Sequence, residues 1–161
     1  MEISLNHFLK YNLWANTRLA ALIPDEAADV ELISSFPTIR KTLYHMWDAQ
    51  EVWLNRLNGA PVNHWPSENF NGTFNEAKEL FIQSSQKMIE FILAKDDSFF
   101  KVSLAYTNMK GITYTNTHEE ILMHVCNHAT LHRGQIITML RNAGVTSLQS
   151  TDMITYFREN K

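Results

Sequence analysis

Every fourth residue is a histidine in the stretch His124-Val125-Cys126-Asn127-His128-Ala129-Thr130-Leu131-His132-Arg133-Gly134-Gln135. In an α-helix, residues four positions apart lie on nearly the same face, one turn from each other. Two imidazoles placed in this way can bind one metal ion from a single helix, as they do in zinc sites of the H-E-x-x-H type. The stretch therefore predicts both a long helix and a candidate metal site.

The helix around this stretch is expected to run from Thr117 to Gly144 and to bury one apolar face. The stripe that defines this face consists of Ile121, Val125, Ile136 and Met139. At about 100° per residue, His128 and His132 lie within about 30° of the centre of the stripe, and His124 lies about 70° away. The periodicity thus directs His128 and His132 into the interior and leaves His124 as a flanking residue.

A second interpretation of the same histidines needs no metal. Two histidines one turn apart can pack in a core, with each ring N–H bonded to a carbonyl group or a water molecule. Burying both rings then requires two sets of hydrogen-bond partners. The spacing alone leaves both interpretations open.

Four long helices and one short helix are expected along the chain. Only 5 Gly and 4 Pro occur in 161 residues, which favours long helices over many short strands. Two helices open with a capping box, in which the Thr hydroxyl and the Glu carboxylate each accept a backbone N–H. These openings are Thr73-Phe74-Asn75-Glu76 and Thr117-His118-Glu119-Glu120. The expected helices span residues 4–23, 37–59, 73–95, 117–144 and 151–159, with Pro37 in the first turn of the second.

The predicted fold class is all-α, a four-helix bundle with a short β-hairpin before the last long helix and a short C-terminal helix. The connections 60–72 and 96–116 are longer than a helical hairpin needs, and a bundle can use such lengths for crossovers. Apolar and polar residues alternate over 100–106 and 112–115, around Asn108-Met109-Lys110-Gly111. That pattern predicts the hairpin.

Length and composition are typical of a single globular domain covering residues 1–161. Hydrophobic residues make up 45% and charged residues 19%, and the net charge is −3. No basic cluster favours a nucleic-acid partner. We find neither a signal peptide nor an apolar run of about 18 residues, so a soluble, cytoplasmic protein without a membrane partner is expected. Cys126 is the only cysteine, which excludes an internal disulfide.

A metal ion needs at least a third protein ligand, which another helix should supply. His45 is the candidate on the second long helix, in the segment Thr42-Leu43-Tyr44-His45-Met46-Trp47-Asp48-Ala49. It lies about 120° from the centre of the apolar stripe of that helix, so periodicity does not direct it into the core. Asp48 and Glu51 are alternative ligands or partners of the ligands, and a solvated surface position is the simpler expectation for both.

The remaining candidates have weaker support in the sequence. His118, in the first turn of its helix, is expected to be exposed. His7 has no partner in sequence, and His64 lies in a loop where a surface position is expected. Cys126 is expected to be a small buried side chain and not a thiolate ligand.

Four parts of the sequence are similar to segments of a known family. They are Tyr11-Asn12-Leu13-Trp14-Ala15-Asn16, then Leu43-Tyr44-His45 with Glu51-Val52-Trp53-Leu54-Asn55-Arg56-Leu57, then His124 to Ile136, and the ending Thr151-Asp152-Met153-Ile154-Thr155-Tyr156-Phe157. In near-full-length register, these parts resemble the DinB-like family of damage-inducible, stress-response bacterial proteins. The family is also called the YfiT-like metalloenzymes and is distinct from the DNA polymerase that shares the name.

The resemblance implies an up-down-down-up four-helix bundle that is often a homodimer. It also implies a histidine triad, in which one divalent metal ion is held by His45, His128 and His132. Characterised members include thiol-dependent transferases and isomerases that use bacillithiol, mycothiol or similar low-molecular-weight thiols. The cofactor expected here is one divalent ion, with zinc or nickel placed before iron.

Three imidazoles around a dication leave an open position, as in catalytic and not structural zinc sites. The leading hypothesis is a thiol S-transferase or isomerase, whose partners are a small-molecule thiol and an electrophile. Alternatives are a metal-hydroxide hydrolase, with Asp48, Glu51 or His124 assisting proton transfer, and a bundle that binds metal without catalysis. Ala129 stands where a zincin has its glutamate, which disfavours a protease. Arg133 is expected to form a structural salt bridge, with attraction of an anionic substrate group as the alternative.

Overall fold

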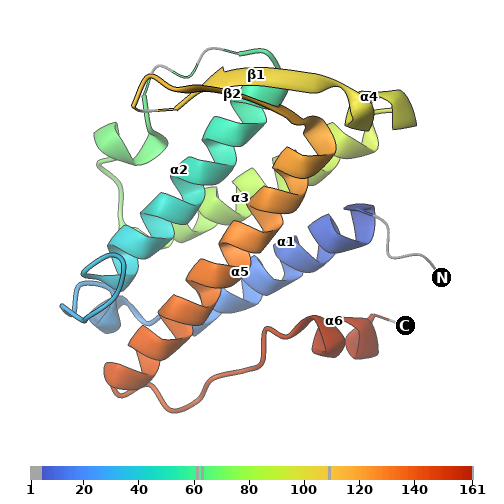
Figure 1. Ribbon diagram of the computed structural model, residues 1–161. Helices are drawn as coiled ribbons and strands as arrows, with labels where there is room; N and C mark the ends of the chain where they lie inside the picture. The colour runs from blue at the N-terminus through green and yellow to red at the C-terminus, as the bar shows by residue number, and fades with distance from the viewer. Residues whose placement is uncertain (1–4, 61, 63, 109, 161) are drawn as a thin grey trace.

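The computed structural model describes residues 5–60, 62, 64–108 and 110–160. The long helices are α1 (Leu5–Leu22), α2 (Ile39–Leu57), α3 (Phe74–Leu93) and α5 (His118–Asn142). The shorter elements are α4 (Asp97–Lys101), α6 (Met153–Glu159), the strands β1 (Ser103–Thr107) and β2 (Thr113–Thr117), and two 3₁₀ turns, η1 (Asp25–Ala27) and η2 (Pro66–Asn69). The mostly helical fold and the hairpin are confirmed, whereas α4 and both 3₁₀ turns were not predicted (Figure 1).

Local capping explains where the long helices begin. Both predicted capping boxes form, at Thr73 with Glu76 and at Thr117 with Glu120. The expected start of α2 at Pro37 is wrong by two residues, because the Thr38 hydroxyl accepts the Lys41 N–H and caps the helix. Pro37 lies outside, where its carbonyl accepts the Leu32 N–H at 2.8 Å.

Each long helix packs against two of the other three. Helix α1 contacts α3 and α5, and α2 contacts the same two helices, so each has two buried faces. One apolar cluster surrounds Leu43 and Ile136, and a second surrounds Met88 and Val125. No helix among the described residues has both the length and the apolar character needed to cross a membrane.

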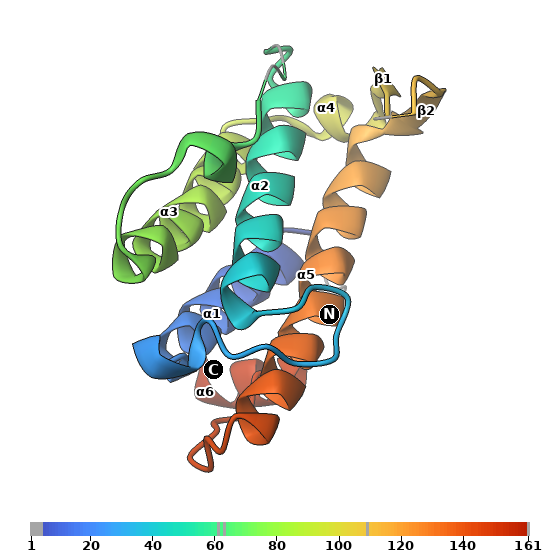
Figure 2. The same ribbon diagram turned by 90° about the vertical axis from the view of Figure 1, so that its left-hand side faces the viewer.

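The hairpin lies across the C-terminal end of α2 and the start of α5 (Figures 1 and 2). Its strands are antiparallel, with Ser103 opposite Thr117. The predicted first strand began too early, because Asp96 caps α4 and places Phe100 in that helix. Met109, in the predicted turn, lies outside the described residues.

A buried polar network joins the four long helices. The guanidinium of Arg133, on α5, donates to the amide oxygens of Asn12 and Asn16 on α1, at 2.6 and 2.7 Å. The amide nitrogen of Asn16 donates in turn to the hydroxyl of Ser85 on α3, at 3.0 Å. That hydroxyl donates to the side-chain oxygen of Gln50 on α2, at 2.9 Å. Since buried polar groups are costly without partners, this network fixes how the helices are rotated against one another.

We predict that Asn16→Ala lowers the free energy of unfolding by about 2–4 kcal/mol, because it leaves a buried guanidinium short of an acceptor. Urea denaturation of the purified protein measures the change. Asn127→Ala is the matched control, since Asn127 is exposed on α5, and its effect should stay within about 0.5 kcal/mol. Equal losses in the two variants would contradict a structural role for the network.

Candidate metal centre

Helices α2 and α5 bring three imidazole rings together at one point. The Nε2 atom of His128 lies 3.0 Å from Nε2 of His45 and 3.0 Å from Nε2 of His132. Among the described residues, these three form the group of possible metal ligands whose donor atoms all lie within 4.8 Å of one another. The structure therefore assembles the three residues that the resemblance implied, one from α2 and two from α5.

The nitrogen separations suit a shared ion. Nitrogens bonded at about 2.0–2.1 Å to one metal ion lie about 3 Å apart when they meet it at roughly 90–100°. Hydrogen bonding alone fits less well, because Nε2 of a neutral His128 carries either one proton or one lone pair and faces two other nitrogens. An ion bound by all three rings would give each of these nitrogens a partner.

Gln135 orients the ring of His132. The amide oxygen of Gln135 lies 2.7 Å from Nδ1 of His132 and can only accept, so this ring nitrogen donates. In the neutral ring the lone pair then lies on Nε2, which faces the centre. The amide nitrogen of Gln135 donates to the Ser35 hydroxyl at 2.7 Å, and Figure 2 shows the segment between α1 and α2 reaching across to α5. Such hydrogen bonds around ligands typically fix tautomer and ring direction.

Phe36 covers the centre from the same segment. Its ring centroid lies 4.5 Å from that of His45 and 5.9 Å from that of His132. The sequence did not predict Phe36, Ser35 or the role of Gln135. The spacing of Gln135 three residues after His132 could have indicated their contact, whereas no local pattern marks Phe36.

The surroundings of the centre lower the pKa of His45 and of His128, which favours the neutral form of both rings. Burial lowers the pKa of His45 from its ordinary value, and positive charge on His132 lowers it further. Burial, followed by the charges of the neighbouring histidines, lowers the pKa of His128 to about 4. At neutral pH these two rings are therefore unprotonated, which is the form that binds metals.

The acidic candidates are not part of the cluster. Asp48 is buried, so the expectation of a surface position is wrong, and its carboxylate accepts the N–H of Ser67 at 2.8 Å and the hydroxyl of Ser67 at 2.6 Å. These bonds hold η2 against α2, and burial raises the pKa of Asp48. Glu51 is half-buried and is not among the grouped ligands.

The other histidines and Cys126 lie outside the centre. The ring of His124 is 5.6 Å from that of His128, flanking the centre as predicted. His118 is buried against Phe99, at 4.2 Å between ring centroids, so its expected exposure is wrong. His7 and His64 are exposed. Cys126 is buried as expected, and burial raises the pKa of its thiol to about 12.

Arg133 forms no salt bridge within the part of the chain that the structure describes, and its burial leaves no accessible anion site. Its side chain is 1% exposed, and four neutral groups surround its guanidinium. These are the amides of Asn12 and Asn16, the hydroxyl of Thr130 at 2.7 Å and the hydroxyl of Tyr11 at 3.5 Å. Both roles expected from the sequence are therefore wrong, and the residue instead connects α5 to α1.

Known proteins are similar to this chain in sequence and in fold. The model of the DinB family matches residues 1–159. Protein DinB of Bacillus subtilis (strain 168) is 30% identical over 148 residues, which cover 86% of this chain and 85% of that protein. A DinB-like protein from Bacillus cereus has a similar structure, with a TM-score of 0.70 and 17% identity over 88% of this chain and 91% of the other. A DinB-like protein from Bacillus subtilis gives a TM-score of 0.71 and 14% identity, over 92% and 96%.

We predict that the metal-free protein loses stability as the pH falls from about 6.5 toward 4. In this range His128 binds a proton in the unfolded chain, where its pKa is about 6.5, but not in the folded chain, where the pKa is about 4. Protonation therefore favours unfolding. Urea midpoints measured in EDTA at pH 7.5 and 5 should differ less for His128→Gln than for the natural chain. His64→Gln is the control and should retain the full difference. An undiminished difference in His128→Gln would show that His128 is not the source of the pH dependence.

Proposed function

We propose that this chain, which belongs to the DinB family, binds one divalent metal ion through His45, His128 and His132 and uses it to activate a low-molecular-weight thiol. The observation that carries the proposal is the convergence of three Nε2 atoms from two helices. Imidazole is an uncharged ligand, so a dication bound by these three residues would keep its full charge and favour an anionic ligand. Zinc and nickel are the ions that we propose first, with iron next, because imidazole nitrogens suit all three.

The proposed reaction is transfer of the thiol sulfur to an electrophilic carbon, or an isomerisation through such an adduct. His45, His128 and His132 would hold the dication, and its positive charge would lower the pKa of the small-molecule thiol. In the transfer, the sulfur–carbon bond forms as the leaving group departs with its bonding electrons, and the thiol proton goes to solvent. Gln135 holds the ring of His132 in position, and the ring of Phe36 lies next to the rings of His45 and His132.

Hydrolysis by a metal-bound hydroxide is a weaker candidate, because it needs a nearby base. Both carboxylate oxygens of Asp48 accept hydrogen bonds from Ser67, and Glu51 does not join the cluster. His124 is the remaining base near His128. A bundle that binds metal without catalysis is the third candidate, and turnover measurements separate it from the other two.

The finer architecture and assembly are also part of the proposal. We propose the up-down-down-up order for the four long helices, supported by their alternating contacts and by the long connections before α3 and before α5. A homodimer and a cytoplasmic location are proposed from the family resemblance. Sedimentation velocity of the purified chain tests the dimer.

We predict about one zinc or nickel ion per chain, and loss of most of it in His128→Ala and in His132→Ala, because two nitrogens bind an ion much more weakly than three. His124→Ala is the control, since its ring flanks the centre, and it should retain the metal. Elemental analysis after dialysis measures the stoichiometry. Unchanged metal in the first two variants would refute the ligand assignment, and equal loss in His124→Ala would place that ring among the ligands.

Activity should depend on thiol and metal together. We expect the metal-loaded protein to consume a small electrophile such as 1-chloro-2,4-dinitrobenzene only with a low-molecular-weight thiol present, and EDTA or His128→Ala to reduce the rate by 100-fold or more. Absorbance of the thioether product, corrected for the spontaneous reaction, measures the rate. Turnover without thiol would favour hydrolysis, and stoichiometric metal with no turnover in a broad screen would favour the binding-only candidate.

A further inference from the structure

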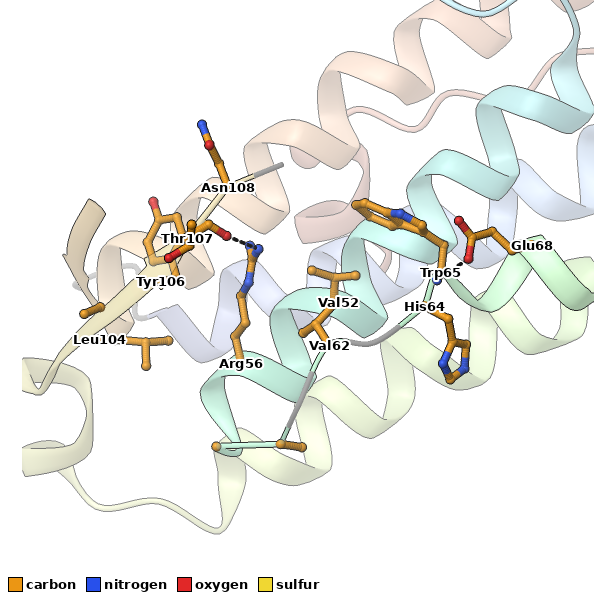
Figure 3. Close-up of a pocket in the computed structure, with 13 residues that line it drawn as sticks. Val52, Arg56, Val62, His64, Trp65, Glu68, Leu104, Tyr106, Thr107 and Asn108 are labelled. Atoms are coloured by element: carbon orange, nitrogen blue, oxygen red, sulfur yellow. Dashed lines mark hydrogen bonds between the residues drawn. The ribbon is translucent and has the colours of Figure 1, made fainter. Parts of the chain in front are cut away.

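A cavity of about 540 Å³ lies between the last turns of α2, the strand β1 and residues in and just before η2 (Figure 3). This volume is in the range of small-molecule binding sites. Val52 and Leu104 supply apolar surface, and Trp65 and Tyr106 supply aromatic surface. None of the three clustered histidines lines this cavity.

Arg56 lines this cavity, and its guanidinium lies next to two aromatic rings. Its central carbon lies 4.6 Å from the ring centroid of Trp53 and 5.1 Å from that of Tyr106. One Nη2 hydrogen is donated to the Thr107 carbonyl at 3.1 Å. Cation–π contact with both rings and the hydrogen bond to Thr107 restrict the rotamers of the side chain and so limit where its positive charge lies.

No carboxylate among the described residues forms an ion pair with Arg56. The cavity contains one acidic side chain, Glu68, one of whose oxygens accepts the Trp65 N–H at 3.2 Å. Figure 3 shows Glu68 and Arg56 on opposite sides of the cavity, with Val62 between them. A guanidinium has five N–H donors, and the Thr107 carbonyl takes one of them. Donors and charge are therefore left for a ligand.

We infer that this cavity is a second binding site, for a small organic monocarboxylate with an apolar or aromatic body. The carboxylate pairs with the planar fork of Arg56, which matches its two oxygens. The body lies against Val52, Leu104 and the aromatic rings. Glu68 repels negative charge at the far side, which fixes the orientation and disfavours a dicarboxylate. The site does not require the metal.

Isothermal titration calorimetry of the full chain in EDTA tests the inference. Phenylacetate is the probe, and uncharged phenylacetamide is its matched comparison. We expect phenylacetate to bind the natural chain at least 10-fold more tightly than phenylacetamide. Arg56→Gln should remove this preference. Arg141→Gln, which changes an exposed arginine of α5, should leave it intact.

Glu68→Gln tests the same site without changing Arg56 or its contacts with the aromatic rings, and is therefore informative even if Arg56→Gln loosens the hairpin. It should tighten phenylacetate binding two- to five-fold and leave phenylacetamide unchanged. Equal affinities of the two probes for the natural chain, or weaker phenylacetate binding in Glu68→Gln, would overturn the inference. The inference would also be overturned if Arg56→Gln, shown to be folded by circular dichroism, still preferred phenylacetate over phenylacetamide.

Discussion

The buried charge of Arg133 is the constraint on which the arrangement of the helices depends. A guanidinium without water must find acceptors for its N–H groups, and it finds them in the amide oxygens of Asn12 and Asn16 on α1. Neighbouring residues of a helix point about 100° apart. Turning Arg133 toward α1 therefore turns the adjacent His132 away from α1, toward α2, where His45 meets it. The rotation of α5 that satisfies the charge also forms the histidine cluster.

Periodicity predicted the parts of the fold and site that depend on one helix at a time. The apolar stripe of α5 correctly directed His132 into the interior, and the two capping boxes located the starts of α3 and α5. His45 could not be assigned in this way, because α2 packs against both α3 and α5 and so has two buried faces. A single apolar stripe describes only one of these two faces. The prediction that His45 is a metal ligand came from the family resemblance.

Three errors about single side chains share a physical cause, since each of these residues has its partner in another element of the fold. Asp48 was expected at the surface, but Ser67 from the following connection binds its carboxylate. Arg133 was expected to pair with a carboxylate, but neutral amides from α1 surround it. His118 was expected to be exposed, but α4, a helix that no sequence pattern marked, places Phe99 against it. Local spacing contains no information about such contacts.

The proposed metal centre and the Arg56 cavity are linked by one rigid element. His45 and Arg56 lie on α2 about 16 Å apart along its axis and only about 20° apart in direction, so both face the same side of the helix. Trp53 stands between them, with its ring 5.7 Å from that of His124 and 4.8 Å from that of Tyr106. One aromatic side chain thus lies next to both His124, which flanks the centre, and Tyr106, which lines the cavity. Because His45 and Arg56 belong to the same helix, the distance between the metal centre and the cavity is set by helix geometry and not by a loop.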